Sequence, residues 1–194
     1  TITASAISIV ESSAPPVSSW GIICNMVVAR SAKGGSSGVT HTCEMIGTHR
    51  MTGTEPQFID IGTGDARRRI AYRRETRSGS PRPGLLWLAG LKSDMASTKA
   101  STLADYAAKA GVDCVRFDYS GHGLSSGPFE EGTIGRWLEE AVTIFRTIAP
   151  GPRIIVGSST GGYVALLLLK YLLENDPAEA RRIMALVLIA PAWD

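Results

Sequence analysis

The sequence predicts an α/β protein with a mostly parallel, doubly wound sheet of about six strands and helices on both faces. From residue 57 onward, short apolar runs alternate with segments long enough for helices. The runs are continuously apolar, as is typical of strands buried on both faces. Residues 153–170 join one such run to an apolar helix through a sharp turn. Strands that alternate with helices of this length form βαβ units, whose strands are parallel.

Two short strands are expected first, at residues 57–61 and 70–74, as an antiparallel hairpin at the edge of the sheet. The turn between them contains Gly62, Gly64 and Asp65. The remaining elements alternate. Their expected ranges are 84–89, 112–117, 154–156 and 185–190 for strands, and 98–110, 133–148 and 163–173 for helices, with a Gly- and Ser-rich loop at 118–128.

The turn at residues 157–161 has the pattern Gly-x-Ser-x-Gly, with Ser159 at its centre. A strained strand-to-helix turn of this kind holds the serine hydroxyl away from the sheet, and Gly157 and Gly161 leave room around it. The following helix directs its unpaired N–H groups toward the same place. Ser159 is therefore the candidate nucleophile.

The pattern occurs three times, but only once in this context. Ser36 lies in a Gly/Ser-rich stretch with no strand before it, and Ser125 lies in a polar loop that Pro128 follows. Neither position joins a strand to a helix, which the nucleophile turn requires. The other interpretation of Ser159 is that of an ordinary small residue in a tight turn.

Residues 1–52 differ from residues 53–194 and are interpreted as a low-complexity or disordered leader ahead of the domain. The leader holds nine serines and only two acids, Glu11 and Glu44. This composition resembles a transit peptide, although its basic residues are few. A disordered extension, or residues translated ahead of a start at Met45 or Met51, fits as well. A cytoplasmic location is expected, with a mitochondrial one as the alternative.

Charge and cysteine usage exclude several classes of function. The net charge of +2 argues against a polyanionic partner, and the arginines at 67–69, 73 and 74 are expected on a solvated edge strand, with no nucleic-acid site. Three cysteines without Cys-x-x-Cys spacing disfavour a disulfide framework and a zinc site. His41 and His49 are too isolated to bind a metal, and no run is long enough to span a membrane. No metal or organic cofactor is expected.

Three stretches resemble the α/β-hydrolase superfamily: WLAGL at 87–91, RFDYSGHGLSSG at 116–127 and VGSSTGG at 156–162. They are similar to the mitochondrial palmitoyl-protein thioesterase and acyl-glucuronide esterase group and its bacterial counterparts. The resemblance implies a partial α/β-hydrolase fold over about residues 57–194. It also implies Ser159 as nucleophile, with the Leu91 and Thr160 main-chain amides as the oxyanion hole.

Asp118 and His122 precede Ser159, whereas the resemblance places the triad acid and base after the nucleophile. Asp118 is therefore expected to accept backbone N–H bonds in its loop, with His122 packed nearby or facing the pocket. His122 as the base stays open, because geometry defines a triad. No histidine follows Ser159. The chain is accordingly expected to stop before its acid and base, and its last strand to leave an apolar edge exposed.

Two functions remain at this point. The first is a serine hydrolase of small-molecule carboxylic esters or thioesters, with its triad acid and base missing from this chain. The second is a non-catalytic binding domain, or an inactive fragment, with the same fold. A nucleotide-binding site at residues 121–123 is excluded, because Ser126 occupies the position of the third glycine in the Gly-x-Gly-x-x-Gly pattern. The sequence does not determine the oligomeric state.

Overall fold

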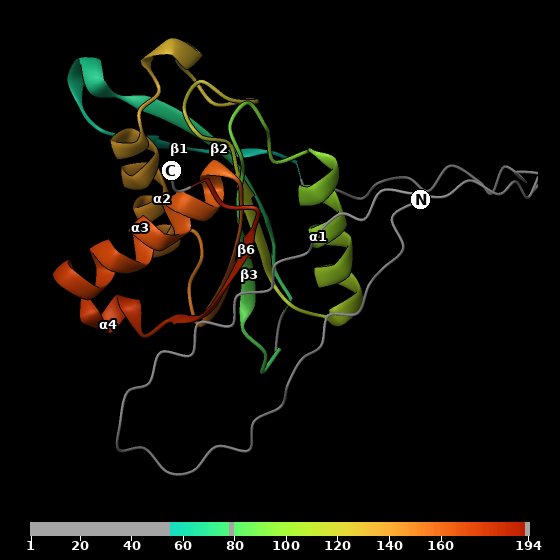
Figure 1. The fold of residues 1–194 in the computed structure, drawn as a ribbon. Helices are drawn as coiled ribbons and strands as arrows, with labels where there is room; N and C mark the ends of the chain where they lie inside the picture. The colour runs from blue at the N-terminus through green and yellow to red at the C-terminus, as the bar shows by residue number, and fades with distance from the viewer. Residues whose placement is uncertain (1–54, 78–79, 193–194) are drawn as a thin grey trace, which may run out of the picture.

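The computed structural model describes residues 55–77 and 80–192, which form one six-stranded sheet with helices on both sides (Figure 1). The strands are β1 (Gln57–Ile61), β2 (Arg68–Glu75), β3 (Gly84–Leu88), β4 (Cys114–Phe117), β5 (Arg153–Ser158) and β6 (Ile183–Ile189). Their order in the sheet is β1-β2-β4-β3-β5-β6. β2 pairs antiparallel with β1 and β4, and all other pairs are parallel. The predicted fold class is confirmed.

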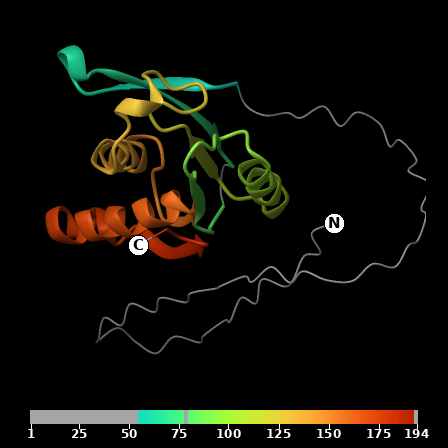
Figure 2. The same cartoon turned by 45° about the horizontal axis from the view of Figure 1, so that its top comes forward.

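The helices are α1 (Thr98–Ala110), α2 (Ile134–Thr147), α3 (Thr160–Asn175) and the short α4 (Pro177–Ala180). Two 3-10 turns, η1 (Gly64–Ala66) and η2 (Phe129–Glu131), lie in the connections. α1 covers one face of the sheet, whereas α2 and α3 cover the other (Figure 2). The predicted leader at residues 1–52, with Cys24, Cys43, His41 and His49, lies outside the described residues.

Local sequence explains where these helices begin and end. The Thr133 hydroxyl accepts the Arg136 N–H and caps α2, which buries Trp137 and Phe145 on its apolar face. α1 ends at Gly111, whose φ of 68° lies in the left-handed region that favours glycine. The buried side chains of both helices meet β3 to β5, so the core lies on either side of the parallel strands.

Three details differ from the sequence-based expectation. The second strand is longer than predicted and is not an edge strand, because β4 pairs with its other side. α3 begins at Thr160, before the predicted residue 163, and so includes Gly161 and Gly162, where a Cβ would overlap Leu88 and Pro191 respectively. η2 and α4 were not predicted, because both are too short to show a period.

β6 is the last strand at its end of the sheet. Within residues 55–77 and 80–192 no strand pairs with its outer edge, so the sheet is open there. Met184, Val187 and Ile189 of this strand are exposed. An apolar strand edge of this kind was expected from the sequence, and it is the part of the fold least protected against association with other strands.

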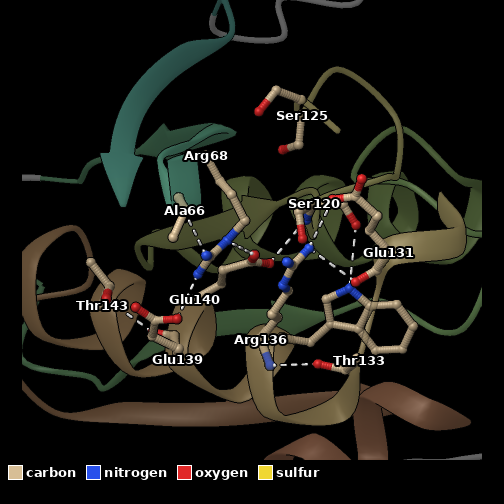
Figure 3. Close-up of polar contacts among 12 residues, drawn as sticks. Ala66, Arg68, Ser120, Ser125, Glu131, Thr133, Arg136, Glu139, Glu140 and Thr143 are labelled. Carbon is tan, nitrogen blue, oxygen red and sulfur yellow. Dashed lines mark hydrogen bonds and ion pairs between the residues drawn. The ribbon is translucent and has the colours of Figure 1, made fainter. Parts of the chain in front are cut away.

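Arg68 lies in a buried ion-pair network, in contrast to the solvated strand face that the arginine-rich stretch predicts (Figure 3). Its Nε donates to Glu140 at 2.8 Å and its terminal nitrogen to Glu139 at 2.6 Å. Glu140 is fully buried on α2 and also accepts the Ser120 N–H at 2.9 Å. Burial raises the pKa of the Glu140 carboxyl, and the bonds from Ser120 and Arg68 oppose this shift. The network ties β2, α2 and the loop after β4 together.

Asp118 connects the loops that follow β3 and β4. One carboxylate oxygen accepts the Met95 N–H at 2.6 Å, and the other accepts the Leu124 N–H at 2.8 Å. A Cβ at Gly123 would lie 2.1 Å from the second oxygen, so only glycine fits there. Burial raises the pKa of Asp118, which the two N–H bonds partly offset. Both loops therefore depend on one buried carboxyl group.

We expect Arg68→Met to destabilise the fold by about 3–5 kcal/mol, because Glu140 then loses the cation that compensates its buried charge. Arg68→Met with Glu140→Gln should be more stable than Arg68→Met alone, since the charge is gone while an acceptor for Ser120 N–H remains. Urea unfolding measures both. Arg67→Met is the control: Arg67 pairs with Asp60 at the surface, and its loss should change little. Equal stability of the single and double variants would contradict the role of the ion pair.

Asp118→Asn should lower the free energy of unfolding by about 1–3 kcal/mol. The NH₂ group of the asparagine would face one of the two backbone N–H groups that now donate to the carboxylate. Asp94→Asn is the matched control. Asp94 accepts a single backbone N–H, from Ala96, and the asparagine keeps an oxygen for it. Thermal unfolding of both variants checks this. If Asp118→Asn lowers the stability no more than Asp94→Asn does, the loops do not depend on Asp118.

Candidate active site

The candidate site lies at the carboxyl ends of the parallel strands, where side chains from several connections meet. Three non-glycine residues in the described part of the chain have positive φ: Lys92 at 54°, Ser159 at 53° and Ala190 at 42°. They follow β3, β5 and β6 respectively. Strained backbone of this kind is concentrated at functional sites, and here it is concentrated at one edge of the sheet.

Ser159 stands alone between β5 and α3. Its φ of 53° and ψ of −122° turn the chain sharply from the strand into the helix. Its N–H donates to the Ile189 carbonyl at the end of β6, and its carbonyl accepts the Gly162 N–H, both at 2.9 Å. The side chain is half-buried, and its hydroxyl has no hydrogen-bond partner in the part of the chain that the structure describes. The main chain is held on both sides while the hydroxyl stays available.

Gly157 and Gly161 allow this turn because neither position has space for a side chain. A Cβ at Gly161 would lie 2.1 Å from the Leu88 carbonyl oxygen, and one at Gly157 would lie 2.5 Å from the Gly161 oxygen. Both distances are shorter than real Cβ contacts. The first turn of α3 therefore lies directly against the end of β3.

The segment that contains Leu91 and the first residue of α3, Thr160, both lie beside Ser159. A Cβ at Gly90 would lie 3.3 Å from the Ser159 Cβ, so the Gly90–Leu91 segment passes beside the serine. Leu91 is half exposed. Thr160 is the first residue of α3, and the first N–H groups of a helix have no acceptor within it. The structure therefore brings the three residues predicted for the nucleophile and oxyanion hole to one place.

Lys99 is a neighbour of this turn that sequence reasoning missed. Its ammonium group lies 3.1 Å from the hydroxyl of Ser158, the buried residue before Ser159. The contact joins the first turn of α1 to the end of β5, across 59 positions in the chain. No sequence pattern marks Lys99, because only the packing of α1 on the sheet brings it there.

His122 is buried beside the loop that contains Leu91. Its Nε2 accepts the Lys92 N–H, and its Nδ1 faces the Ser120 carbonyl oxygen, each at 3.1 Å. An amide N–H only donates and a carbonyl only accepts, so these partners select the neutral ring with the proton on Nδ1. The rings of Tyr119, Phe129 and Trp137 surround it. Both ring nitrogens thus have backbone partners.

A cavity of about 310 Å³ lies next to this loop. His122, Lys92 and Phe129 are among its lining residues, and Ser159 is not. The cavity therefore lies beside the turn that contains Lys92 and does not include the candidate nucleophile. Asp118 does not line it either, and both of its carboxylate oxygens are bonded to backbone N–H groups.

The described residues contain no group of His, Cys, Asp or Glu side chains arranged to hold a metal ion. Cys114 is fully buried in β4, and burial raises the pKa of its thiol to about 12. A thiol of this kind stays protonated at neutral pH and is not a nucleophile. Among the described helices, none combines the length and apolar character needed to cross a membrane.

Comparison with known proteins identifies relatives of this chain among mitochondrial thioesterases. The mitochondrial palmitoyl-protein thioesterase ABHD10 of Homo sapiens is 38% identical over 112 residues, which is 58% of this chain and 34% of that protein. The Bos taurus protein of the same name is 37% identical over 125 residues. This chain therefore spans little more than a third of the curated relatives it matches. Their mitochondrial names agree with the alternative location and give the expected cytoplasmic one no support.

Two solved structures extend the comparison. A protein from Agrobacterium vitis S4 assigned as a hydrolase has a TM-score of 0.65 and 44% identity, covering 71% of this chain and 52% of that one. Mouse α/β-hydrolase domain-containing protein 10 has a TM-score of 0.58 and 30% identity, covering 70% of this chain and 50% of that one. The serine aminopeptidase S33 family profile (Hydrolase_4) matches residues 80–194. The chain therefore belongs to this family of α/β-hydrolases.

Proposed function

We propose that this chain carries the nucleophile and oxyanion hole of a serine hydrolase that cleaves small-molecule carboxylic esters or thioesters. The observation that carries the proposal is the backbone of Ser159, held at φ 53° between β5 and α3 while its hydroxyl has no partner in the described structure. The family supports a hydrolase, and the thioesterase names of the relatives support an acyl substrate. The same names support a mitochondrial location.

In this mechanism the Ser159 hydroxyl attacks the acyl carbonyl, and its proton passes to a general base. The carbonyl oxygen becomes an oxyanion, which the Leu91 and Thr160 main-chain N–H groups stabilise. The dipole at the start of α3 adds a favourable field. Collapse of the tetrahedral intermediate expels the alcohol or thiol and leaves an acyl-serine, which water then hydrolyses. No metal or organic cofactor takes part in these steps.

The general base in this proposal is not His122. Its Nε2 is occupied by the Lys92 N–H and its Nδ1 by the Ser120 carbonyl, so neither nitrogen is directed at Ser159. It is also the only histidine among residues 55–77 and 80–192. We propose that the acid and base come from outside the described residues. A non-catalytic domain is the other candidate, which the unpartnered Ser159 hydroxyl argues against.

We expect the 194-residue chain to hydrolyse p-nitrophenyl butyrate at least about 10²-fold more slowly than a typical enzymatic kcat of roughly 10 s⁻¹, because no base is directed at Ser159 among residues 55–77 and 80–192. Free imidazole should restore part of the rate by acting as that base. Ser159→Ala measures the background that imidazole alone produces, so the difference between the two proteins is the Ser159-dependent rate.

Two outcomes would contradict the proposal. Identical rates for the wild type and Ser159→Ala, with and without imidazole, would favour the non-catalytic domain. The other outcome is a normal enzymatic rate without imidazole that His122→Ala abolishes. If adding Lys92→Gly, which relieves the backbone strain at the residue that His122 contacts, does not restore this rate, His122 is the base.

A further inference from the structure

The turn after β3 has an unusual residue at its third position. Ser93 N–H donates to the Gly90 carbonyl at 3.1 Å, which closes a four-residue turn with Leu91 and Lys92 in its middle. Lys92 has a φ of 54°. A positive φ at the third position is the mark of a type II turn, which normally has glycine or asparagine there. Lysine at this position strains the backbone and would be relaxed in a type I turn.

Type I and type II turns differ chiefly in which way the peptide between their two central residues faces. In this turn that peptide joins Leu91 to Lys92, and its N–H donates to His122 Nε2 at 3.1 Å. Reversing the peptide would move this N–H away from the ring. His122 therefore stabilises the strained arrangement over the relaxed one.

The ring of His122 is itself firmly held. Only 5% of the residue is exposed, and its ring centroid lies 5.3 Å from those of both Phe129 and Trp137. Its Nδ1 bonds to the Ser120 carbonyl, which also accepts the Trp137 indole N–H at 3.2 Å. The Lys92 ammonium lies 4.9 Å above the Phe129 ring, so both the backbone and the side chain of Lys92 contact this aromatic cluster. The acceptor at Nε2 thus has a defined position.

We propose that His122 is a positioning residue that sets the direction of the Leu91–Lys92 peptide and so holds the turn in the type II form. The Leu91 N–H, which the proposed function places in the oxyanion hole, belongs to the preceding peptide of the same turn. The inference rests on that function for its catalytic consequence only. Relaxation of the turn would shift Leu91, and an oxyanion donor that is lost altogether costs about 10²–10³ in rate. His122 acts here through a main-chain hydrogen bond and transfers no proton.

The first test does not depend on hydrolysis and uses NMR of the full chain. The ¹⁵N shifts of the His122 ring should show a neutral imidazole with its proton on Nδ1. A strong NOE between Leu91 Hα and the residue 92 amide proton should report the type II turn. In His122→Leu this NOE should weaken, whereas His122→Gln, which keeps an acceptor near the Nε2 position, should retain more of it. A proton on Nε2 in the wild type would overturn the proposal.

A second-site variant separates positioning from packing. Glycine favours positive φ by itself, so Lys92→Gly in the His122→Leu background should restore the type II NOE. Lys92→Ala in the same background is the matched control, since it also loses the contact with Phe129 but keeps the strain. If His122 only fills the core, glycine and alanine will behave alike, and the proposal fails. Thermal melts identify a variant that does not fold, and His122→Gln then carries the test.

The catalytic consequence is measured by the rate at which an alkyl fluorophosphonate labels Ser159, followed by the mass of the adduct. The Ser159 oxygen forms a bond to phosphorus, fluoride leaves, and the proton passes to the buffer. We expect His122→Leu to slow labelling by about tenfold and added Lys92→Gly to recover most of it. Absence of labelling in the wild type even with imidazole present as the base would contradict the proposed function and leave the NMR result to decide the turn. Labelling unchanged by His122→Leu would refute the catalytic role of the turn alone.

Discussion

The close contact between the first turn of α3 and the end of β3 is the constraint on which the site depends. At Gly161 the two main chains are so near that a methyl group would overlap the Leu88 carbonyl oxygen. This contact requires the chain to leave β5 abruptly, which forces Ser159 into a positive φ. The hydrogen bond from Ser159 N–H to the end of β6 then holds the strained residue in place. The neighbours of Ser159 supply the stabilisation that offsets the strain.

The loops around this turn are held by buried polar groups that join distant segments. Asp118 connects the loops after β3 and β4, and Glu140 connects α2 to the second of these loops and to Arg68 on β2. Each carboxyl group is buried, and each accepts hydrogen bonds from more than one segment of the chain. A buried carboxyl group destabilises the fold when some of its hydrogen bonds are missing, so each of these groups restricts its loops to the arrangement that supplies all of them. His122 acts on a smaller scale, on one peptide of the loop after β3.

Much of the fold could be predicted from sequence because its signals are local. Four apolar runs and three long helical segments indicated the parallel sheet, and a serine between two glycines indicated the turn after β5. The predicted position of the second strand, at the edge of the sheet, was wrong, because the pairing of strands depends on the whole sheet. Arg68 was expected in solvent for a related reason: the carboxyl groups that pair with it lie about seventy residues later.

The sequence by itself determined the class of fold, the strand-turn-helix around Ser159 and the glycines that this turn needs, because periodicity and steric limits act within a few residues. Only the tertiary structure decided what surrounds the turn. Lys99 reaches Ser158, and His122 accepts the amide of Lys92, across 59 and 30 positions of the chain. The left-handed backbone of Lys92 has no local cause, since lysine does not favour it. It depends on contacts that exist only once the loops after β3 and β4 are packed together.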